Sequence, residues 1–223
     1  MGAETDISWA RSTVNLATGC RKISPGCDNC YAAKLSERNL PAVGKWGPDA
    51  IRIYSKAAWE KLPEWNRKAE KEGVIRTVFR DSLADAFEGT QVRFDGETTI
   101  GEWQELRDGP RKGHREVLLR QRDESARYPW LCFLMLSKRT WNQRIFAEQE
   151  GWPANWWQGI STENQDAYDE RLPFTIPGAR VFLSVEPILG PVTVRHPVDW
   201  LIAGGESKQG ARRADPEWFC SLR

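Results

Sequence analysis

The sequence predicts an α/β protein with a parallel sheet, and two observations carry this prediction. Short apolar runs typical of strands recur along the chain, and segments with helical patterning separate several of them. Strands that alternate with helices indicate a parallel sheet. The length of 223 residues suits one domain covering residues 1–223, and α/β barrels of this length are common.

The candidate strands and helices follow each other along the chain. The strand-like runs are Ile51–Tyr54, Val74–Phe79, Leu131–Leu136, Trp157–Ile160, Val181–Val185 and Trp200–Ala203. The helix-compatible segments are Tyr31–Arg38, Ala57–Glu72 and Thr140–Glu150, the second with Pro63 near its start.

Residues 88–127 interrupt this pattern with a polar, charged and glycine-containing stretch. We interpret it as an insertion or lid between two strands, with one helix around Arg115–Gln121. Its length argues against a minimal barrel.

Charge and hydropathy narrow the functional classes. Lys and Arg total 32 against 31 Asp and Glu, so the net charge of +1 gives no bulk attraction to nucleic acid, and any such contact must be local. The longest strongly apolar run, Trp130–Leu136, is far shorter than the roughly 20 residues that span a bilayer. The polar N-terminus lacks the apolar region of a signal peptide. We therefore expect a cytoplasmic protein without a membrane partner.

Polar residues follow five of the candidate strands. They are Arg80–Ser82, Ser137–Arg139, Ser161–Asn164, Glu186 and Gly204–Ser207. If the sheet curls into a barrel, these places converge on the face where such barrels carry their working groups. The alternative is that strands simply end where polar sequence begins.

Three of the five cysteines crowd into eleven positions, with the spacing C-x6-C-x2-C. An odd total and this crowding make a poor disulfide framework and favour a metal site. Pro25 and Gly26 predict a turn before the second cysteine, and C-x2-C lets two thiolates face one centre. We expect Cys20, Cys27 and Cys30 to be ligands of one metal centre.

The type of metal follows from the number of nearby ligands. A structural zinc site needs four, and the two histidines, His114 and His196, lie far along the chain. Three thiolates on a [4Fe-4S] cluster instead leave one iron free to chelate the amino and carboxyl groups of S-adenosylmethionine. A zinc ribbon completed by Cys132, Cys220 or a histidine is the alternative.

Four segments resemble a phage-associated radical S-adenosylmethionine-like family, whose members are often described as phage proteins of unknown function. They are the run Ser12–Ala32 with its cysteines, Leu136–Arg139, Gly159–Gln165, and Leu183–Pro191 together with Ile202–Ser207. They occur in the family's order and cover most of the chain. The spacing differs from the usual C-x3-C-x2-C, and Gly-Gly-Glu lies near the C-terminus and not after the second strand.

The resemblance implies a partial (β/α) barrel of the radical S-adenosylmethionine type and a three-cysteine [4Fe-4S] cluster. It also implies reductive cleavage of S-adenosylmethionine by an external electron donor, giving a 5′-deoxyadenosyl radical that abstracts hydrogen from substrate. In this interpretation Gly204, Gly205 and Glu206 bind the cofactor, as that motif does in relatives.

The residues after the other strands receive roles from their chemistry. Asp81, Ser82 and Asp85 are candidates for holding a substrate or ribose hydroxyl, although a helix N-cap explains Asp81 or Ser82 as well. Lys138 and Arg139 are candidate catalytic residues that would bind a carboxylate or phosphate, with surface solvation as the alternative.

The remaining candidates lie in the C-terminal half. Ser161, Glu163 and Asn164 are expected to hydrogen-bond the cofactor, with a helix cap as the competing interpretation. Glu186 follows apolar residues and would be costly to bury unpaired, so we expect a catalytic partner or ligand there. Arg212 belongs to a basic patch beside Trp218 that suits a nucleotide phosphate or is a solvated face.

The predicted function is therefore a radical S-adenosylmethionine enzyme acting on a nucleotide or a modified thymidine in DNA, in the host cytoplasm if the chain is phage-encoded. Phage relatives build hypermodified thymidines, so the resemblance suggests isomerisation of N-linked glycinyl-thymidine to its C-linked form. A radical lyase that repairs DNA photoproducts shares the cofactor and is one alternative. The other is a zinc-stabilised nucleic-acid-binding or adaptor protein without catalysis.

Overall fold

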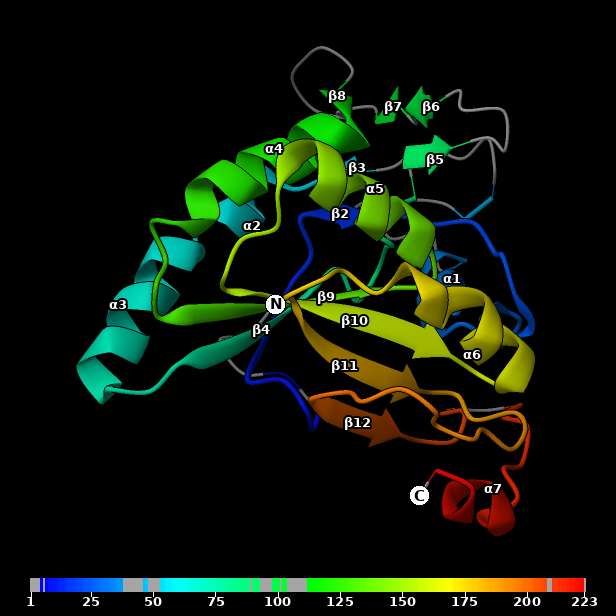
Figure 1. Ribbon diagram of the computed structural model, residues 1–223. Helices are drawn as coiled ribbons and strands as arrows, with labels where there is room; N and C mark the ends of the chain where they lie inside the picture. The colour runs from blue at the N-terminus through cyan, green and yellow to red at the C-terminus, as the bar shows by residue number, and fades with distance from the viewer. Residues whose placement is uncertain are drawn as a thin grey trace.

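Six strands of the computed structural model form one parallel sheet (Figure 1). The structure describes residues 5, 7–37, 46–47, 53–88, 90–92, 98–100, 102–103, 112–207 and 210–222. The strands of the sheet are β1 (Ser12–Val14), β4 (Arg76–Arg80), β9 (Leu131–Ser137), β10 (Trp156–Thr162), β11 (Arg180–Val185) and β12 (Trp200–Ala203). Their order in the sheet, β1-β4-β9-β10-β11-β12, is also their order in the chain, so the sheet winds in one direction.

Helices connect most of these strands and cover one face of the sheet (Figure 1). They are α3 (Leu62–Glu72) before β4, α4 (His114–Ser125) before β9, α5 (Thr140–Glu150) before β10, and α6 (Gln165–Arg171) with the 3-10 turn η2 (Leu172–Phe174) before β11. The short helices α1 (Tyr31–Ser36) and α2 (Lys56–Trp59) lie between β1 and β4, and α7 (Pro216–Cys220) follows β12.

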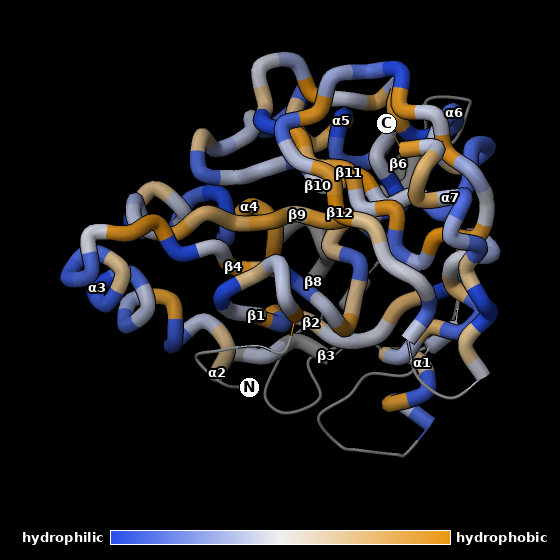
Figure 2. Tube along the Cα trace, turned by 90° about the horizontal axis from the view of Figure 1, so that it is seen from below, coloured by the Kyte–Doolittle hydropathy of each residue, from blue (hydrophilic) through white to orange (hydrophobic). Residues whose placement is uncertain are grey.

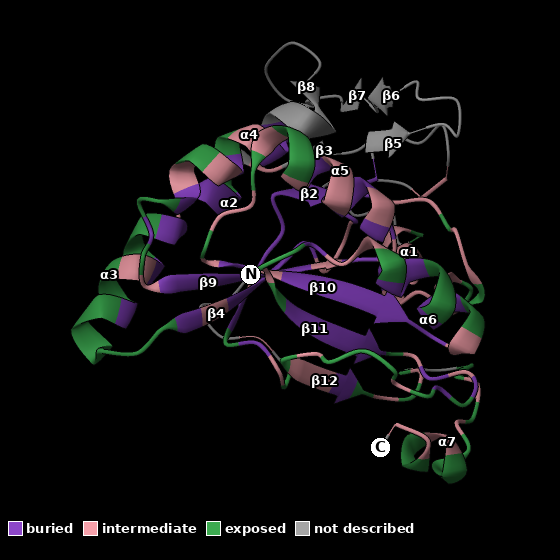
Figure 3. Ribbon diagram, in the orientation of Figure 1, coloured by how far each residue is buried: buried purple, intermediate pink, exposed green. Residues whose placement is uncertain are grey.

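Apolar side chains cover both faces of the central strands. In β9, Leu131 and Phe133 are buried in the core under the helices, whereas Cys132 and Leu134 are buried in a second cluster with Phe182. Burial on both sides explains the continuous apolar run in this strand. Figure 2 shows the apolar character of β9, β10 and β11, and Figure 3 shows that these strands are buried.

Three small antiparallel pairs complete the described strands. They join β2 (Ala17–Thr18) to β3 (Ile53–Tyr54), β5 (Thr90–Val92) to β6 (Thr98–Ile100), and β7 (Glu102–Trp103) to β8 (Lys112–Gly113).

None of the helices in the described ranges has the length and apolar character needed to span a bilayer.

The sequence predictions for the strands are mostly confirmed. Five apolar runs correspond to β4, β9, β10, β11 and β12. The run Ile51–Tyr54 is an exception, because its described part, β3, pairs with β2 outside the main sheet. The first strand of the sheet, β1, was not predicted, since Ser12–Val14 is too short to show an alternating pattern.

The bounds of two predicted helices, Ala57–Glu72 and Tyr31–Arg38, differ in the structure. The segment Ala57–Glu72 is two helices, because α2 ends at Trp59 and α3 begins at Leu62 with Pro63, which has no N–H to continue a preceding helix. The helix α1 ends at Ser36, and Arg38 lies outside the described residues.

The helix expected at Arg115–Gln121 is α4, which extends to Ser125. Its buried Val117 and Leu118 belong to the main core, so this part of the predicted insertion is a crossover helix of the sheet. Much of the remainder of residues 88–127 lies outside the described residues, and its role as a lid stays a prediction.

Candidate functional site

A cavity of about 790 Å³ lies at the carboxyl edge of the sheet. Residues from the ends of all six strands line it: Thr13, Asn15, Asp81, Ser82, Asp85, Ser137, Lys138, Arg139, Ser161, Ser184, Glu186, Gly205 and Glu206. Each of the five polar places predicted to converge beyond the strands therefore contributes at least one residue to one space, although Arg80 and Thr162 do not line it. Glu163, Asn164, Gly204 and Arg212 do not line this cavity, although Glu163 and Arg212 contact residues that do.

The segment 20–30, called here the cysteine loop, forms another wall of the cavity. Cys20, Cys27 and Cys30 are half-buried free thiols, and all three line the cavity. A single 3-10 turn, η1 (Pro25–Cys27), shapes the middle of the loop. The N–H of Cys27 donates to the Ser24 carbonyl at 2.9 Å, and the N–H of Cys30 donates to the Cys27 carbonyl at 3.3 Å. The turn predicted from Pro25 and Gly26 is thus confirmed.

Arg139 holds the start of the cysteine loop. Its Nη1 lies 3.9 Å from the Cys20 Sγ, and its Nη2 donates to the Arg21 carbonyl at 3.1 Å. The same guanidinium pairs with Asp85 at 2.8 Å and approaches Glu88 at 3.7 Å, and only 1% of its side chain is exposed. Arg139 is therefore not a solvated surface residue, and its described contacts are with the protein.

The surroundings of Cys20 favour the neutral thiol. Burial, followed by the negative charge of Glu88, raises the pKa of Cys20 to about 12, and Arg139 only partly opposes this. A metal ion that binds this sulfur must displace the proton, as coordinated thiols generally lose theirs. Burial acts to lower the pKa of Arg139, but Asp85, Cys20 and Glu88 together more than reverse this, so the guanidinium stays charged.

Asp85 joins the end of β9 to the segment after β4. It accepts hydrogen bonds from the Ser137 hydroxyl at 2.8 Å, from the N–H of Phe87 at 2.9 Å and from the N–H of Lys138 at 3.3 Å, in addition to Arg139. These protein partners give Asp85 a structural role in positioning Arg139. A substrate contact of Asp85 stays a prediction.

Glu163 supports the middle of the cysteine loop from the end of β10. Its side chain has 0% exposure and accepts from Arg171 at 2.9 Å, from Lys138 at 3.4 Å and from the N–H of Gly26 at 3.4 Å. Burial alone would raise the pKa of Glu163, but Lys138 and Arg171, with hydrogen bonds from Ser24 and Arg171, lower it to about 2. A Cβ on Gly26 would lie 3.1 Å from the Glu163 Cδ, so glycine permits this close approach.

Glu206 and Arg212 hold the end of the cysteine loop from the segment after β12. Glu206 pairs with the Arg212 guanidinium, accepts from the Arg212 N–H at 2.7 Å and accepts from the Asn29 amide at 2.9 Å. Arg212 also donates to the Pro25 carbonyl at 2.8 Å. The hydrogen bond from Arg212 lowers the pKa of Glu206 to about 2, although burial opposes this.

Asp81 and Ser82 follow β4, and neither caps a helix, because the described residues 82–88 form turns. Asp81 has a φ of 59°, is buried, and accepts from the N–H groups of Leu16 at 2.8 Å and Ala17 at 3.3 Å, besides its pair with Arg80. Burial raises the pKa of Asp81, and Arg80 opposes this. Asp81 therefore fastens β4 to the chain after β1.

Ser82 takes part in two contacts at the cavity wall. Its hydroxyl donates to the Asn15 side-chain oxygen at 3.2 Å, and its carbonyl accepts from the Tyr31 hydroxyl at 2.6 Å. Burial raises the pKa of Tyr31 to about 12, so this phenol stays a donor. Tyr31 directly follows Cys30, so this bond connects the last cysteine to the end of β4.

Lys138 and Ser161 place a polar pair on the cavity wall. The Lys138 ammonium donates to the Ser161 hydroxyl at 2.7 Å, and 16% of the lysine side chain is exposed. Lys138 lies 3.4 Å from its carboxylate, Glu163, which it shares with Arg171. It is therefore less closely paired than Arg139, which lies 2.8 Å from Asp85. Lys138 therefore suits an anionic group better than Arg139 does.

The exposure of Glu186 contradicts the prediction from the sequence. Glu186 is exposed, since it comes directly after the end of β11 at the cavity rim, so the expected cost of burying it does not arise. A Cβ on Gly204 would lie 2.9 Å from the Glu186 Oε1, so Gly204 gives this carboxylate its place. For Asn164 the helix cap is confirmed, because its side chain caps α6 by accepting from the N–H of Ala167 at 2.9 Å.

The donor set fits the two metal hypotheses unequally. Across the described residues, no three His, Cys, Asp or Glu side chains gather around a point where they could hold one metal ion. A [4Fe-4S] cluster does not need three side chains around one ion, because each of its cysteines binds a different iron atom. Three free thiols that line one cavity fit this spread-out ligand arrangement.

The other candidates for zinc ligands lie elsewhere. Cys132 is buried in the core beneath the sheet, and Cys220 is exposed on α7. The His196 ring stacks on Tyr168, with centroids 6.3 Å apart, and the His114 side chain lies outside the described residues.

Several residues of the site were missed in the sequence. Asn29, Asn15 and Tyr31 have no motif of their own, and only their positions beside the cysteines or beside β1 could have drawn attention to them. Trp9 and Trp46 also line the cavity, and the high tryptophan count of 12 was the available signal.

Comparison with known proteins gives one match. The model of a family described as a protein of unknown function, DUF5131, matches residues 4–223. The chain belongs to the DUF5131 family. No curated protein and no solved structure matches it. In this DUF5131 protein the matched region includes the whole parallel sheet, the cysteine loop and every residue of the cavity.

Proposed function

We propose that the protein is a radical S-adenosylmethionine enzyme, in which Cys20, Cys27 and Cys30 hold a [4Fe-4S] cluster. The observation that carries this proposal is the position of the three free thiols. They lie on one loop and line one large cavity at the carboxyl edge of a parallel sheet, where α/β enzymes place their reacting groups. The bound cluster and S-adenosylmethionine would supply a one-electron cleavage that yields a hydrogen-abstracting radical, with the electron coming from an external donor.

The sheet supports a finer proposal about the fold. Every strand pairs with the next strand of the sheet along the chain, and all pairs are parallel. A sheet wound in one direction, with helices on one face, is the arrangement expected of a partial (β/α) barrel. We propose that this is a partial barrel of the radical S-adenosylmethionine type.

The chain's own residues would bind and orient the reactants. The ammonium of Lys138, held by Ser161 and Glu163, would bind a carboxylate or phosphate in the cavity. Glu186 at the rim would accept a hydrogen bond from a cationic or hydroxyl group. Trp9, Trp46 and Phe79 line the same cavity and would exclude water from it.

The substrate class rests on the family resemblance. A nucleotide or modified thymidine is proposed, with isomerisation of glycinyl-thymidine as the specific reaction and repair of a DNA photoproduct as the alternative. The test uses substrate deuterated at the carbon that loses hydrogen. Because an isomerisation returns a hydrogen to the product radical, the label is sought in both 5′-deoxyadenosine and recovered S-adenosylmethionine. Deuterium in either supports the substrate tested, and its absence from both with both substrates refutes these two assignments.

The cofactor is tested first, by anaerobic reconstitution with iron and sulfide. We expect about four irons per chain and dithionite-dependent formation of 5′-deoxyadenosine. Cys27→Ala should lose both, whereas the matched control Cys132→Ala, which removes a thiol outside the cavity, should retain both. One zinc per chain without bound iron would refute the proposal and favour a zinc-stabilised binding protein.

A further inference from the structure

The second half of the cysteine loop has side-chain contacts with the segment after β12. Asn29 donates to Glu206 at 2.9 Å and to the Gly210 carbonyl at 3.1 Å, and Pro25 accepts from Arg212 at 2.8 Å. Arg212 also lies 3.7 Å from Asp28. These contacts lie on both sides of Cys27 in the sequence: the one at Pro25 precedes it by two residues, and those at Asp28 and Asn29 fall within the C-x2-C segment.

Glu206 is saturated by these contacts, whereas 37% of the Arg212 side chain is exposed. Both carboxylate oxygens of Glu206 are engaged, one with the Arg212 guanidinium and the other with Asn29 and the Arg212 N–H, and 4% of the Glu206 side chain is exposed. Arg212 directs its Nε and Nη2 donors to Glu206 and Pro25, and its Nη1 lies 3.7 Å from Asp28. A ligand in the cavity would have to break these bonds to use the Glu206 carboxylate.

We propose that Glu206 and Arg212 form a loop clamp, a pair of positioning residues that hold Cys27 and Cys30 in the conformation that lines the cavity. This assigns Glu206 a different role from binding the cofactor's amino group, and Arg212 a different role from binding a nucleotide phosphate. The purpose of such a clamp rests on the proposed function, because a loop that must offer thiols to a cluster benefits from being preorganised.

The clamp acts before any metal binds, so it is tested in the metal-free protein. Under anaerobic conditions, the rate at which N-ethylmaleimide alkylates each cysteine is measured by peptide mass spectrometry. Two cysteines serve as internal references: exposed Cys220 reports the reactivity of the reagent, and buried Cys132 reports opening of the core.

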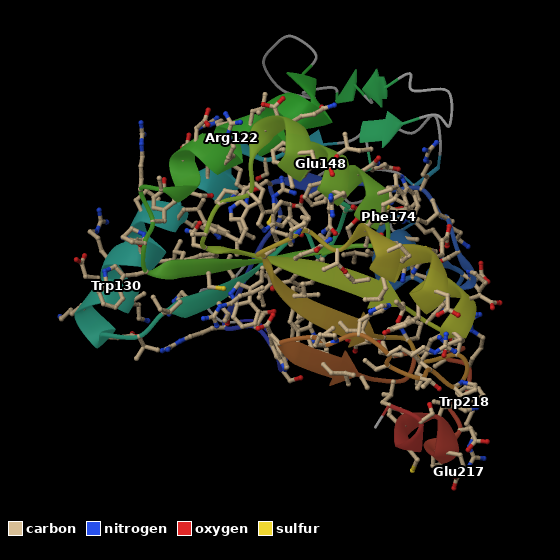
Figure 4. All side chains as sticks on the ribbon, viewed as in Figure 1. Arg122, Trp130, Glu148, Phe174, Glu217 and Trp218 are labelled. Carbon is tan, nitrogen blue, oxygen red and sulfur yellow. The ribbon has the colours of Figure 1, made fainter. Side chains whose placement is uncertain are left out.

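The main variant is Arg212→Ala, and its matched control is Arg144→Ala. Arg144 also pairs with a carboxylate, Glu148, and also donates to a backbone carbonyl, that of Thr175 at 2.8 Å. It lies on α5, and Figure 4 shows Glu148 on the helical layer, far from α7. The control therefore removes an arginine that makes the same two kinds of contact from α5, which is not part of the cysteine loop or of the segment after β12.

We expect alkylation of Cys27 and Cys30 to accelerate on the order of tenfold in Arg212→Ala, because several hydrogen bonds that oppose local opening are lost. Cys132 should keep its rate, Arg144→Ala should match the unmodified protein, and Arg212→Lys should be intermediate. Unchanged rates for Cys27 and Cys30 in Arg212→Ala would overturn the proposal. If alkylation of Cys132 also accelerates in Arg212→Ala, the core has opened and a milder variant is needed. Glu206→Gln keeps the side-chain shape, and the alkylation rates of its Cys27 and Cys30 then decide the proposal.

Iron retention separates this proposal from the proposed function. After reconstitution, the clamp predicts faster loss of iron to a chelator in Arg212→Ala than in Arg144→Ala. If no form of the protein takes up iron, the proposed function fails while the alkylation rates still decide the clamp. If iron binds and the alkylation rates do not respond, the clamp fails and the proposed function stands.

Discussion

The Oε1 atom of Glu163 accepts a hydrogen bond from the backbone N–H of Gly26, 137 positions earlier in the chain, at 3.4 Å. This contact joins the end of β10 to the turn that precedes Cys27. Arg139 provides a comparable contact at the start of the cysteine loop, through Arg21, and the loop clamp provides one near its end, through Asn29. The loop is therefore fastened at its beginning, middle and end by residues that follow three different strands.

Gly26→Ala should disturb this contact. The added Cβ would lie 3.1 Å from the Glu163 Cδ, and Glu163 is itself held by Arg171 and Lys138, so it has little room to retreat. We expect the free energy of unfolding to fall by about 1 to 2 kcal/mol. Urea unfolding followed by fluorescence checks this. The control is Gly190→Ala, whose Cβ would meet only an ordinary contact with Asn164 at 3.5 Å. Equal losses in the two variants would contradict the steric argument.

Glu163 should make stability depend on acidic pH. Its pKa is about 2 in the folded protein against 4.5 ordinarily, so its contribution is fully present above pH 4.5 and is lost as the pH falls toward 2. Glu163→Gln should lower the free energy of unfolding at neutral pH by about 3 kcal/mol, because buried Arg171 loses its buried carboxylate partner and keeps, among the described carboxylates, only the exposed Glu170 at 4.0 Å.

The pH dependence of unfolding separates Glu163 from other carboxylates. Between pH 4.5 and 2 the slope of the unfolding free energy should be shallower in Glu163→Gln than in the unmodified protein. Glu170→Gln, which removes an exposed carboxylate 4.0 Å from the same Arg171, is the matched control and should keep the full slope. An identical slope in Glu163→Gln would mean that this carboxylate titrates normally in the folded state.

Neighbouring Lys138 and Arg139 should respond differently to the same substitution. Arg139→Met leaves buried Asp85 without its cation, whereas Glu88 keeps Arg21 at 3.9 Å, and the change should cost about 3 kcal/mol of stability. Lys138→Met should cost about 1 kcal/mol, because Glu163 keeps Arg171. Calorimetric unfolding measures both. In the reconstituted protein, Lys138→Met should still hold iron but form less 5′-deoxyadenosine, and full activity in this variant would remove Lys138 from the proposed site.

Asp81 should tolerate asparagine better than alanine. Asparagine retains an oxygen for the N–H groups of Leu16 and Ala17 and accepts the left-handed backbone at φ 59°. Alanine provides no acceptor, so Asp81→Ala should lose about 2 kcal/mol more than Asp81→Asn in chemical denaturation. Similar losses would show that the ion pair with Arg80 and not the backbone contacts determines stability here.

The sheet and the cysteine loop could be predicted from the sequence for clear physical reasons. Strands buried on both faces, such as β9, leave long apolar runs, and three cysteines crowded around a Pro-Gly turn are typical of a metal-binding loop. The strand β1 could not be predicted, since three residues with one apolar position carry no period.

The roles of the charged residues could not be predicted in the same way. Arg139, Glu163 and Glu206 were all expected beyond the strand ends, but a charged residue there looks the same whether it binds a ligand or a loop. The contact partner in the folded structure decides between these two roles, and such partners are far apart in the sequence: Asn29 and Glu206 are 177 positions apart. Pattern and spacing along the chain contain no information on such pairs.

The same remoteness governs the order in which the site is assembled during synthesis. The chain emerges from the ribosome N-terminus first, so the three cysteines leave it long before residues 206–212 do. The sheet can add its strands one at a time, because each pairs with the strand made before it. The cysteine loop, however, receives its last fastening only after β12 is translated. A nascent chain therefore carries a cysteine loop whose last contacts are missing until residues 206–212 have been made, and this wall of the cavity is completed only then.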